Sequence, residues 1–180
     1  RSYSQNGEDV ALAAFFEEQK NYRGFYVDVG ANHPVRFSNT CLYYRNGWRG
    51  INIDPTPGSM KPFKWWRRRD INLEIGIGSA ISSMTFFCFN APALNTFNPV
   101  VAARIGKPYR IIKEVQVEIA PLKEVLAQFL PKNQKIDFLT IDVEGFEMEV
   151  LKSNDWKRFS PTFILVEDHL FTMNNPEHSE

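Results

Sequence analysis

The chain has 180 residues, and its 21 Lys and Arg residues balance its 21 Asp and Glu residues, so the formal net charge is zero. Apolar residues make up 43% and charged residues 23% of the sequence, which excludes a disordered or collagen-like chain and predicts a single globular domain over residues 1–180. Zero net charge also argues against the broad basic field of a nucleic-acid-binding protein, so no nucleic-acid partner is expected.

Short apolar runs alternate with amphipathic runs through the first half of the chain, which is the pattern of βαβ units. Glu8 and Asp9 suit the first turn of a helix, and Ser38 can cap another. In chain order we expect a helix over 8–19, a strand over 25–29, a helix over 38–44, a strand over 50–53, a helix over 61–69 and a strand over 72–77.

The second half continues the same alternation. Strands are expected over 136–141 and 162–166, with a helix carrying Val150 and Leu151 between them. Each short strand is apolar on both faces, as in parallel strands that helices cover on both sides. The sequence therefore predicts an α/β fold with an open, doubly wound, mostly parallel sheet.

The connection between the third and fourth of these strands is too long, at about sixty residues, for a single crossover. Residues 84–89 and 115–119 within it have strand character, and 121–129 have helical periodicity. We interpret 79–114 as an insertion that forms a hairpin or flap near the carboxyl edge of the sheet. Asn95 and Thr96 in this insertion are interpreted as turn residues, with substrate contact as the alternative.

Acidic side chains follow nearly every predicted strand. Ligands of such sheets bind outside the carboxyl ends of the strands, and unpaired carboxylates are costly to bury. A shared polar ligand at this edge is therefore expected. The polar residues at the strand ends are Asp28, Asp54, Glu74, Asp142 with Glu144, and Glu167 with Asp168 and His169.

The turn after the first strand lacks the G-x-G-x-x-G pattern, because Ala31, Asn32, His33 and Pro34 follow Gly30. A dinucleotide needs those glycines so that backbone N–H groups can approach its pyrophosphate. Asp54 follows the second strand, where an acidic residue accepts hydrogen bonds from ribose hydroxyls. A site that binds a nucleoside but no pyrophosphate indicates S-adenosylmethionine as the ligand. The alternative is that Asp28 is a turn residue and Asp54 a helix cap.

Four segments carry a family resemblance: YSQNGED at 3–9, FYVDVGAN at 25–32, GWRGINIDP at 47–55 and IDFLTIDVEGFE at 136–147. With these motifs, which span nearly the whole chain, the sequence resembles the FkbM family of S-adenosylmethionine-dependent methyltransferases. The resemblance implies a class I methyltransferase (Rossmann-like) fold. It also implies O-methylation of a hydroxyl group on a glycan sugar or a related natural product.

The resemblance also assigns cofactor contacts. The residues implied are Asp28, Gly30 and Asn32 on the methionine side, Asp54 at the ribose, Ile75 and Gly76 beside the adenine, and Gln5 closing over the cofactor. The alternative for the Ser4-Gln5 pair is a helix cap. Two departures stand out. Thr140 occupies a position where many members carry Lys, and the thirteen residues after Glu167 are too few for the closing strands of a class I sheet. We therefore expect a truncated or partly ordered C-terminus.

Methyl transfer to a hydroxyl requires removal of its proton by a base or with the help of a metal. The candidates for catalysis are Asp142, Glu144 and His169, and those for binding Mg²⁺ are Asp142, Glu167 and Asp168. His169 is equally well interpreted as a surface histidine. Glu144 can instead interact with the N-terminus of the following helix.

Residues 61–69, KPFKWWRRR, combine five positive charges with Phe63, Trp65 and Trp66. The favoured interpretation is a solvated helix face with its aromatic side chains packed inward. The alternative is a non-catalytic module on a methyltransferase scaffold that binds an anion or touches a membrane surface through this segment.

Cellular location is inferred from three negative observations. Cys41 and Cys88 are too few and too isolated for a disulfide framework, so reduced thiols are expected. No apolar run is long enough to span a membrane, and the first ten residues lack a signal-peptide core. These observations predict a cytoplasmic protein, with peripheral membrane contact still open.

Overall fold

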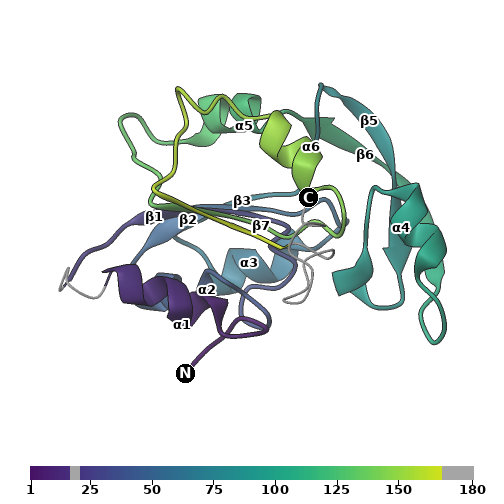
Figure 1. Ribbon diagram of the computed structural model, residues 1–180, viewed down its shortest axis with the longest axis horizontal. Coiled ribbons are helices and arrows are strands. Elements are labelled where there is room, and N and C mark those ends of the chain that lie inside the picture. Colours follow the sequence, from purple (N-terminus) through teal and green to yellow (C-terminus); the bar gives the residue numbers. More distant parts are fainter. Residues whose placement is uncertain (17–20, 168–180) are drawn as a thin grey trace, which may run out of the picture.

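The computed structural model describes residues 1–16 and 21–167 of the chain (Figure 1). Its main sheet has five strands in the order β3-β2-β1-β7-β8, and every neighbouring pair is parallel. The expected doubly wound α/β sheet is thereby confirmed. The five strands are β1 (Phe25–Val29), β2 (Arg49–Ile53), β3 (Ile71–Leu73), β7 (Phe138–Ile141) and β8 (Phe163–Val166).

Helices cover both faces of this sheet (Figure 1). On one face lie α1 (Glu8–Ala13), α2 (Cys41–Arg45) and α3 (Met60–Trp66), and on the other α5 (Leu122–Phe129) and α6 (Glu147–Lys152). Successive side chains of a strand point to opposite faces, so β1 contributes side chains to the cores on both faces of the sheet. Val27 joins the core against α5 and α6, whereas Tyr26 joins the cluster against α1 and α2. No helix within the described part of the chain is long and apolar enough to cross a membrane.

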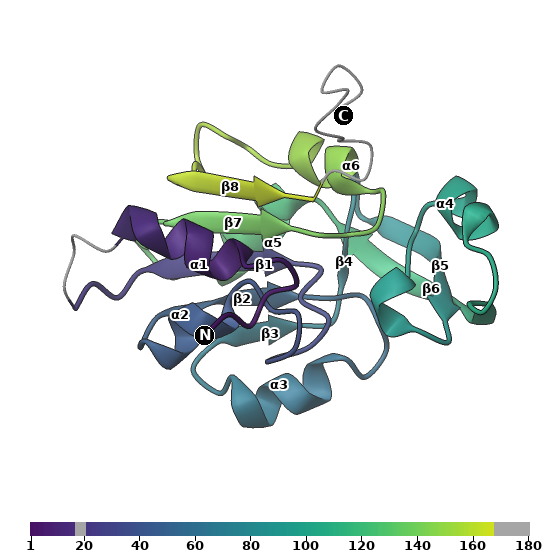
Figure 2. The same ribbon diagram turned by 60° about the horizontal axis from the view of Figure 1, so that its bottom comes forward.

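A second sheet of three strands, in the order β4-β6-β5, lies beyond the carboxyl ends of the main strands (Figure 2). Its strands are β4 (Gly76–Ile77), β5 (Ser82–Phe89) and β6 (Ile111–Ala120). The chain between β5 and β6 forms a 3₁₀ helix, η2 (Pro92–Leu94), and α4 (Pro99–Arg104). Phe86 and Phe97 lie in the core of this unit, and Phe146 from the loop after β7 packs against it. The second sheet is thereby joined to the main one.

The prediction of a single strand over 72–77 is wrong. Residues 71–73 pair with β2 in the main sheet, and residues 76–77 pair with β6 in the second. The second sheet packs tightly around residue 76, because a Cβ on Gly76 would lie 2.6 Å from the ring of Phe97 and 2.7 Å from Ile119 of β6. Strand β6, more than thirty residues further along the chain, therefore decides where the third strand ends.

Helix boundaries also differ from those expected. Helix α1 ends at Ala13 and continues as a 3₁₀ turn, η1 (Ala14–Phe16), and residues 17–20 are not among those described. Helix α2 begins at Cys41, because Ser38 instead closes a turn by accepting a hydrogen bond from the Cys41 amide at 3.1 Å. Helix α3 stops at Trp66, where the chain turns the side chain of Arg67 into the interior.

Arg67 is the largest polar side chain of the interior, with only 1% of its surface exposed. Its Nε donates to Oδ2 of Asp70 at 2.9 Å, and one terminal nitrogen donates to the Pro34 carbonyl at 3.0 Å. The other terminal nitrogen donates to the Tyr26 hydroxyl at 2.7 Å and to Thr40 Oγ1 at 2.9 Å. One guanidinium thus joins the end of α3 to β1, to the loop that follows β1, and to the start of α2.

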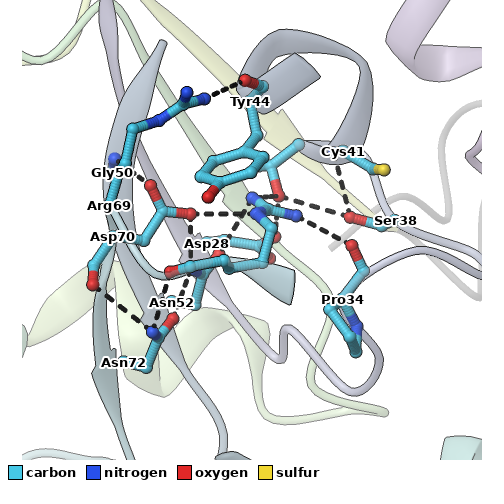
Figure 3. Close-up of polar contacts among 12 residues, drawn as sticks. Asp28, Pro34, Ser38, Cys41, Tyr44, Gly50, Asn52, Arg69, Asp70 and Asn72 are labelled. Atoms are coloured by element: carbon cyan, nitrogen blue, oxygen red, sulfur yellow. Dashed lines mark hydrogen bonds and ion pairs between the residues drawn. The ribbon is translucent and has the colours of Figure 1, made fainter. Parts of the chain in front are cut away.

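The carboxylate of Asp70, which pairs with Arg67, also accepts several hydrogen bonds. Its oxygens accept hydrogen bonds from the Gly50 amide and from the side chain of Asn52, both at 3.0 Å (Figure 3). Asn52 also donates to Asn72 on the neighbouring strand at 2.8 Å. A buried ion pair is stable only when its remaining donors and acceptors are filled in this way.

Replacing Arg67 with Met should strongly destabilise the protein, because it leaves the Asp70 carboxylate buried without its cation. We expect the free energy of unfolding, measured by urea denaturation, to fall by about 3–5 kcal/mol. Arg68→Met at the exposed neighbouring position is the matched control and should change it by no more than about 0.5 kcal/mol. A loss under about 1 kcal/mol for Arg67→Met, typical of a surface ion pair, would contradict this account.

Candidate functional site

The strand register aligns four polar strand ends. Val29 lies opposite both Ile53 and Ile141, and Ile141 lies opposite Val166. The residues that follow these positions therefore leave the sheet at the same level. They are Gly30, Asp54, Asp142 and Glu167, and all four line one cavity.

This cavity has a volume of about 490 Å³ and lies between the strand ends and the second sheet. The arrows in Figure 2 show the main strands directed towards β5 and β6. The volume of the cavity falls within the range of small-molecule sites. Of the residues predicted to bind the cofactor, those in the cavity wall are Gln5, Gly30, Asn32, Asp54 and Ile75.

Gly30 forms a turn that no other residue could form without displacement. Its φ is +90°, and a Cβ there would lie 1.7 Å from the carbonyl oxygen of Asp142. The amides of Gly30 and Ala31 both donate to the Ile53 carbonyl, at 2.9 and 3.1 Å. Because these two N–H groups are used within the fold, the turn does not offer them to a phosphate, in keeping with the missing glycine pattern.

Asp54 is held in a defined orientation at the end of β2. Its Oδ2 accepts a hydrogen bond from the Asn32 amide at 3.0 Å, and its Oδ1 accepts one from the Thr56 amide at 2.9 Å. Burial raises the pKa of Asp54, while these hydrogen bonds oppose the shift. Each carboxylate oxygen retains capacity to accept a further hydrogen bond. The arrangement suits a ligand with two neighbouring hydroxyl groups.

Two predicted cofactor residues are not part of the cavity wall among the described residues. Gly76 lies in β4 and faces Phe97 and Ile119. Asp28 is buried beneath the site, where its Oδ2 accepts a hydrogen bond from Thr40 Oγ1 at 2.7 Å. Since Thr40 also accepts from Arg67, Asp28 belongs to the buried network rather than to the surface of the cavity.

Three carboxylates meet at the ends of β7 and β8. Asp142, Glu144 and Glu167 each place an oxygen within 4.8 Å of the others, and all three are half-buried. The pKa of Asp142 is raised well above its usual range, first by burial and then by a hydrogen bond and charge repulsion from Glu167. Such a cluster can hold a proton at neutral pH or supply hard oxygen ligands to a divalent cation.

The predicted site residues His169 and Asp168 lie outside the described residues. Within the described chain, Glu144 joins Asp142 and Glu167, although the sequence indicated it as a base or as a partner of the following helix N-terminus and not as a metal ligand. Its backbone has a φ of +54°, and Gly145 follows at +86°, so the chain bends sharply here. This bend returns the Glu144 side chain towards β8.

The insertion holds this bend in place. Thr96 Oγ1 donates to the Glu144 carbonyl at 2.8 Å, and the side-chain amide of Asn98 donates to the Gly145 carbonyl at 3.0 Å. Asn95 lines the cavity and donates to Thr56 Oγ1 at 3.1 Å. Thr96 therefore positions the acidic loop, while Asn95 connects the insertion to the Asp54 side of the site.

Sequence reasoning missed the apolar wall of the cavity. The aromatic residues that line it are Phe37, Phe86, Phe97, Tyr109 and Phe146. Three of them come from the segment between β4 and β6. Nothing local in the sequence distinguishes these residues from ordinary core aromatics, because only the packing of the second sheet brings them to the strand ends.

Burial raises the pKa of Asp28 to about 6, from 3.8. The folded protein then binds this proton more tightly than the unfolded chain, so the Asp28 contribution to stability is fully present below pH 4 and is lost as the pH rises through 6. Asp28→Asn removes this titration. We expect the mutant to gain stability relative to the parent between pH 4 and pH 7, by up to about 3 kcal/mol in urea unfolding.

Asp155→Asn, at an exposed position, is the control for removal of a carboxylate. The free energies of unfolding of Asp28→Asn and of the parent protein should differ by an amount that changes between pH 4 and pH 7. A constant difference would contradict the buried, protonatable state of Asp28.

Comparison with known proteins gives a family but no individual relative. A family model described as "Methyltransferase FkbM domain" matches residues 28–180. Searches of the curated proteins and of the solved structures found no match. The five-stranded parallel sheet flanked by helices agrees with the Rossmann-like fold of methyltransferases. Because the match extends from the end of β1 through every later element, the chain belongs to the FkbM methyltransferase family.

Proposed function

We propose that this methyltransferase uses S-adenosylmethionine to methylate a hydroxyl group, on a glycan sugar or a related natural product. The observation that carries the cofactor part is the carboxylate of Asp54. It lies at the end of β2 in the cavity, and two backbone amides fix its orientation. Acidic residues at this point of nucleoside-binding sheets accept the ribose hydroxyls.

When bound, S-adenosylmethionine supplies an activated methyl group on a positively charged sulfur. Asp54 would accept hydrogen bonds from the two ribose hydroxyls. Ile75 would contact the adenine from the β3 side, and the Gly30 turn would leave room for the methionine part. Gln5, which lines the cavity from the N-terminal segment, would close over the cofactor.

The acidic cluster would act on the acceptor. Alignment of the acceptor oxygen with the methyl group contributes most to a displacement of this kind, and the proton of the hydroxyl must still be removed. Asp142 and Glu144 line the same cavity as Asp54, so a carboxylate of the cluster would accept that proton. The aromatic wall would hold the apolar face of the acceptor.

A divalent cation is the alternative to a carboxylate base. Asp142, Glu144 and Glu167 offer three hard oxygen donors close together, which is the ligand chemistry that Mg²⁺ prefers. These residues would hold the ion, and its charge would lower the pKa of a nearby hydroxyl.

A non-catalytic protein on the same scaffold would not need the Asp54 arrangement. Calorimetric titration of S-adenosylhomocysteine separates the two functions. We expect micromolar binding to the protein, weakened about tenfold to a hundredfold by Asp54→Asn, because hydrogen bonds to a charged group are lost. Glu124→Gln on the exposed surface of α5 is the control and should bind as the parent does. Equal binding by Asp54→Asn would contradict the ribose assignment, and no binding by the full protein would contradict the use of this cofactor.

The cation alternative has its own test, which does not depend on activity. We expect Mg²⁺ alone to bind in a calorimetric titration, and Glu167→Gln to weaken this binding by about tenfold or more, since one of three charged ligands is removed. Glu149→Gln on the outer side of α6 is the matched control. Absence of Mg²⁺ binding to the parent protein would leave the carboxylate base as the mechanism.

A further inference from the structure

Helix α3 presents an unusual set of side chains to solvent. We call Lys61, Lys64, Trp65, Trp66 and Arg68 the basic-aromatic patch, and all five are exposed. Trp65 has 79% and Trp66 65% of its surface exposed. The interpretation that the aromatic side chains of this segment pack inward is therefore wrong for both tryptophans and holds only for Phe63.

The inward face of α3 explains this exposure. Met60, Phe63 and Arg67 are buried, and they recur at the spacing of one helical face. Lys61, Lys64 and Trp65 have helical spacing on the opposite face, which turns away from the sheet, and Arg68 lies in the exposed turn that follows α3. Figure 2 shows α3 at the edge of the molecule. Among the described residues, neither indole has an aromatic or cation–π partner, so the fold itself gives no reason for two tryptophans here.

The charge of the patch is also uncompensated. No acidic residue occurs between Pro55 and Arg69, and the flanking Asp54 and Asp70 are both buried with partners of their own. Within the described residues, Lys61, Lys64 and Arg68 form no ion pair. Arg69 differs, because it lies over the ring of Tyr44 at 4.2 Å and donates to its carbonyl oxygen. The net charge of the whole chain is zero, so this positive charge is a local feature.

We propose that the basic-aromatic patch docks the protein on an anionic lipid surface. Indole side chains favour the boundary between headgroups and acyl chains, because one end is apolar and the other can donate a hydrogen bond. Lysine and arginine beside them are attracted to anionic headgroups. Helix α3 has seven residues, so the contact is shallow: two indoles enter the interface and three cations remain at the headgroups.

A lipid surface fits these observations better than a nucleic acid. Single-stranded nucleic acids bind in positively charged grooves that follow the backbone over several nucleotides. Here the tryptophans stand on the outer side of a short helix, and the neutral chain has no wider basic field to extend the contact. The proposal concerns a surface on the outside of the fold and does not depend on methyl transfer in the cavity.

Co-sedimentation with vesicles tests the proposal on the intact protein. We expect binding to vesicles of phosphatidylcholine with 30% phosphatidylglycerol, little binding to pure phosphatidylcholine, and loss of binding at high salt. Lys64→Glu/Arg68→Glu should weaken the binding by more than about twentyfold, because each basic residue contributes about fivefold near such a surface. Trp65→Ala/Trp66→Ala should weaken it by about tenfold or more, and this loss should persist at low salt.

The control is Lys132→Glu/Lys135→Glu in the connection between α5 and β7, where both lysines are exposed. It makes the same change in net charge away from α3 and should retain most of the binding. Thermal unfolding of each variant would verify the fold, and since all the substituted positions are exposed, little change is expected. Binding that does not depend on anionic lipid, or that survives both patch variants, would overturn the proposal. So would tight binding of single-stranded RNA without binding of vesicles.

Discussion

The buried ion pair of Arg67 and Asp70 is the interaction on which the arrangement of the cofactor side depends. An unpaired charge at this depth would be very costly, so the guanidinium must satisfy its donors from several segments at once. Its partners come from β1, the loop after β1 and the start of α2, and those of Asp70 come from β2. These segments carry the turn at Gly30 and the Asp54 carboxylate. A loss of the pair would therefore affect the geometry of the cavity as well as stability.

Two close contacts complete the site from the other side. The turn at Gly30 meets the Asp142 carbonyl so tightly that no Cβ fits between them, which fixes the end of β1 against the end of β7. Thr96 and Asn98 of the insertion hold the carbonyls of Glu144 and Gly145. The three carboxylates are brought together by backbone contacts, although their charges repel one another. Burial first, and then the neighbouring carboxylates, raise the pKa of Asp142.

Helix α3 connects the interior with the surface. Directly after its last turn comes Arg67, which supports the loop beside the cavity, while α3 and the turn after it expose two tryptophans and three cations that form no ion pair among the described residues. The loop between Asp54 and α3 includes Thr56, which lines the cavity. A contact at the outer face of α3 would therefore lie one short loop away from the proposed cofactor site.

The sequence by itself determined the parallel strands β1, β2, β7 and β8 to within two residues, because a short run that is apolar on both faces has few other stable environments. It also determined that Gly30, Asp54 and Asp142 would share one edge, since residues following parallel strands emerge on the same side. Only the tertiary structure decided that residues 72–77 divide between two sheets, because β6 supplies the hydrogen bonds from far along the chain. It also placed Asp28 under the site, where Thr40 donates to it and Arg67 in turn donates to Thr40. Glu144 joins the acidic cluster in a bend that Thr96, distant in sequence, holds in place. Long-range partners, and not local pattern, determine which polar side chains reach the cavity.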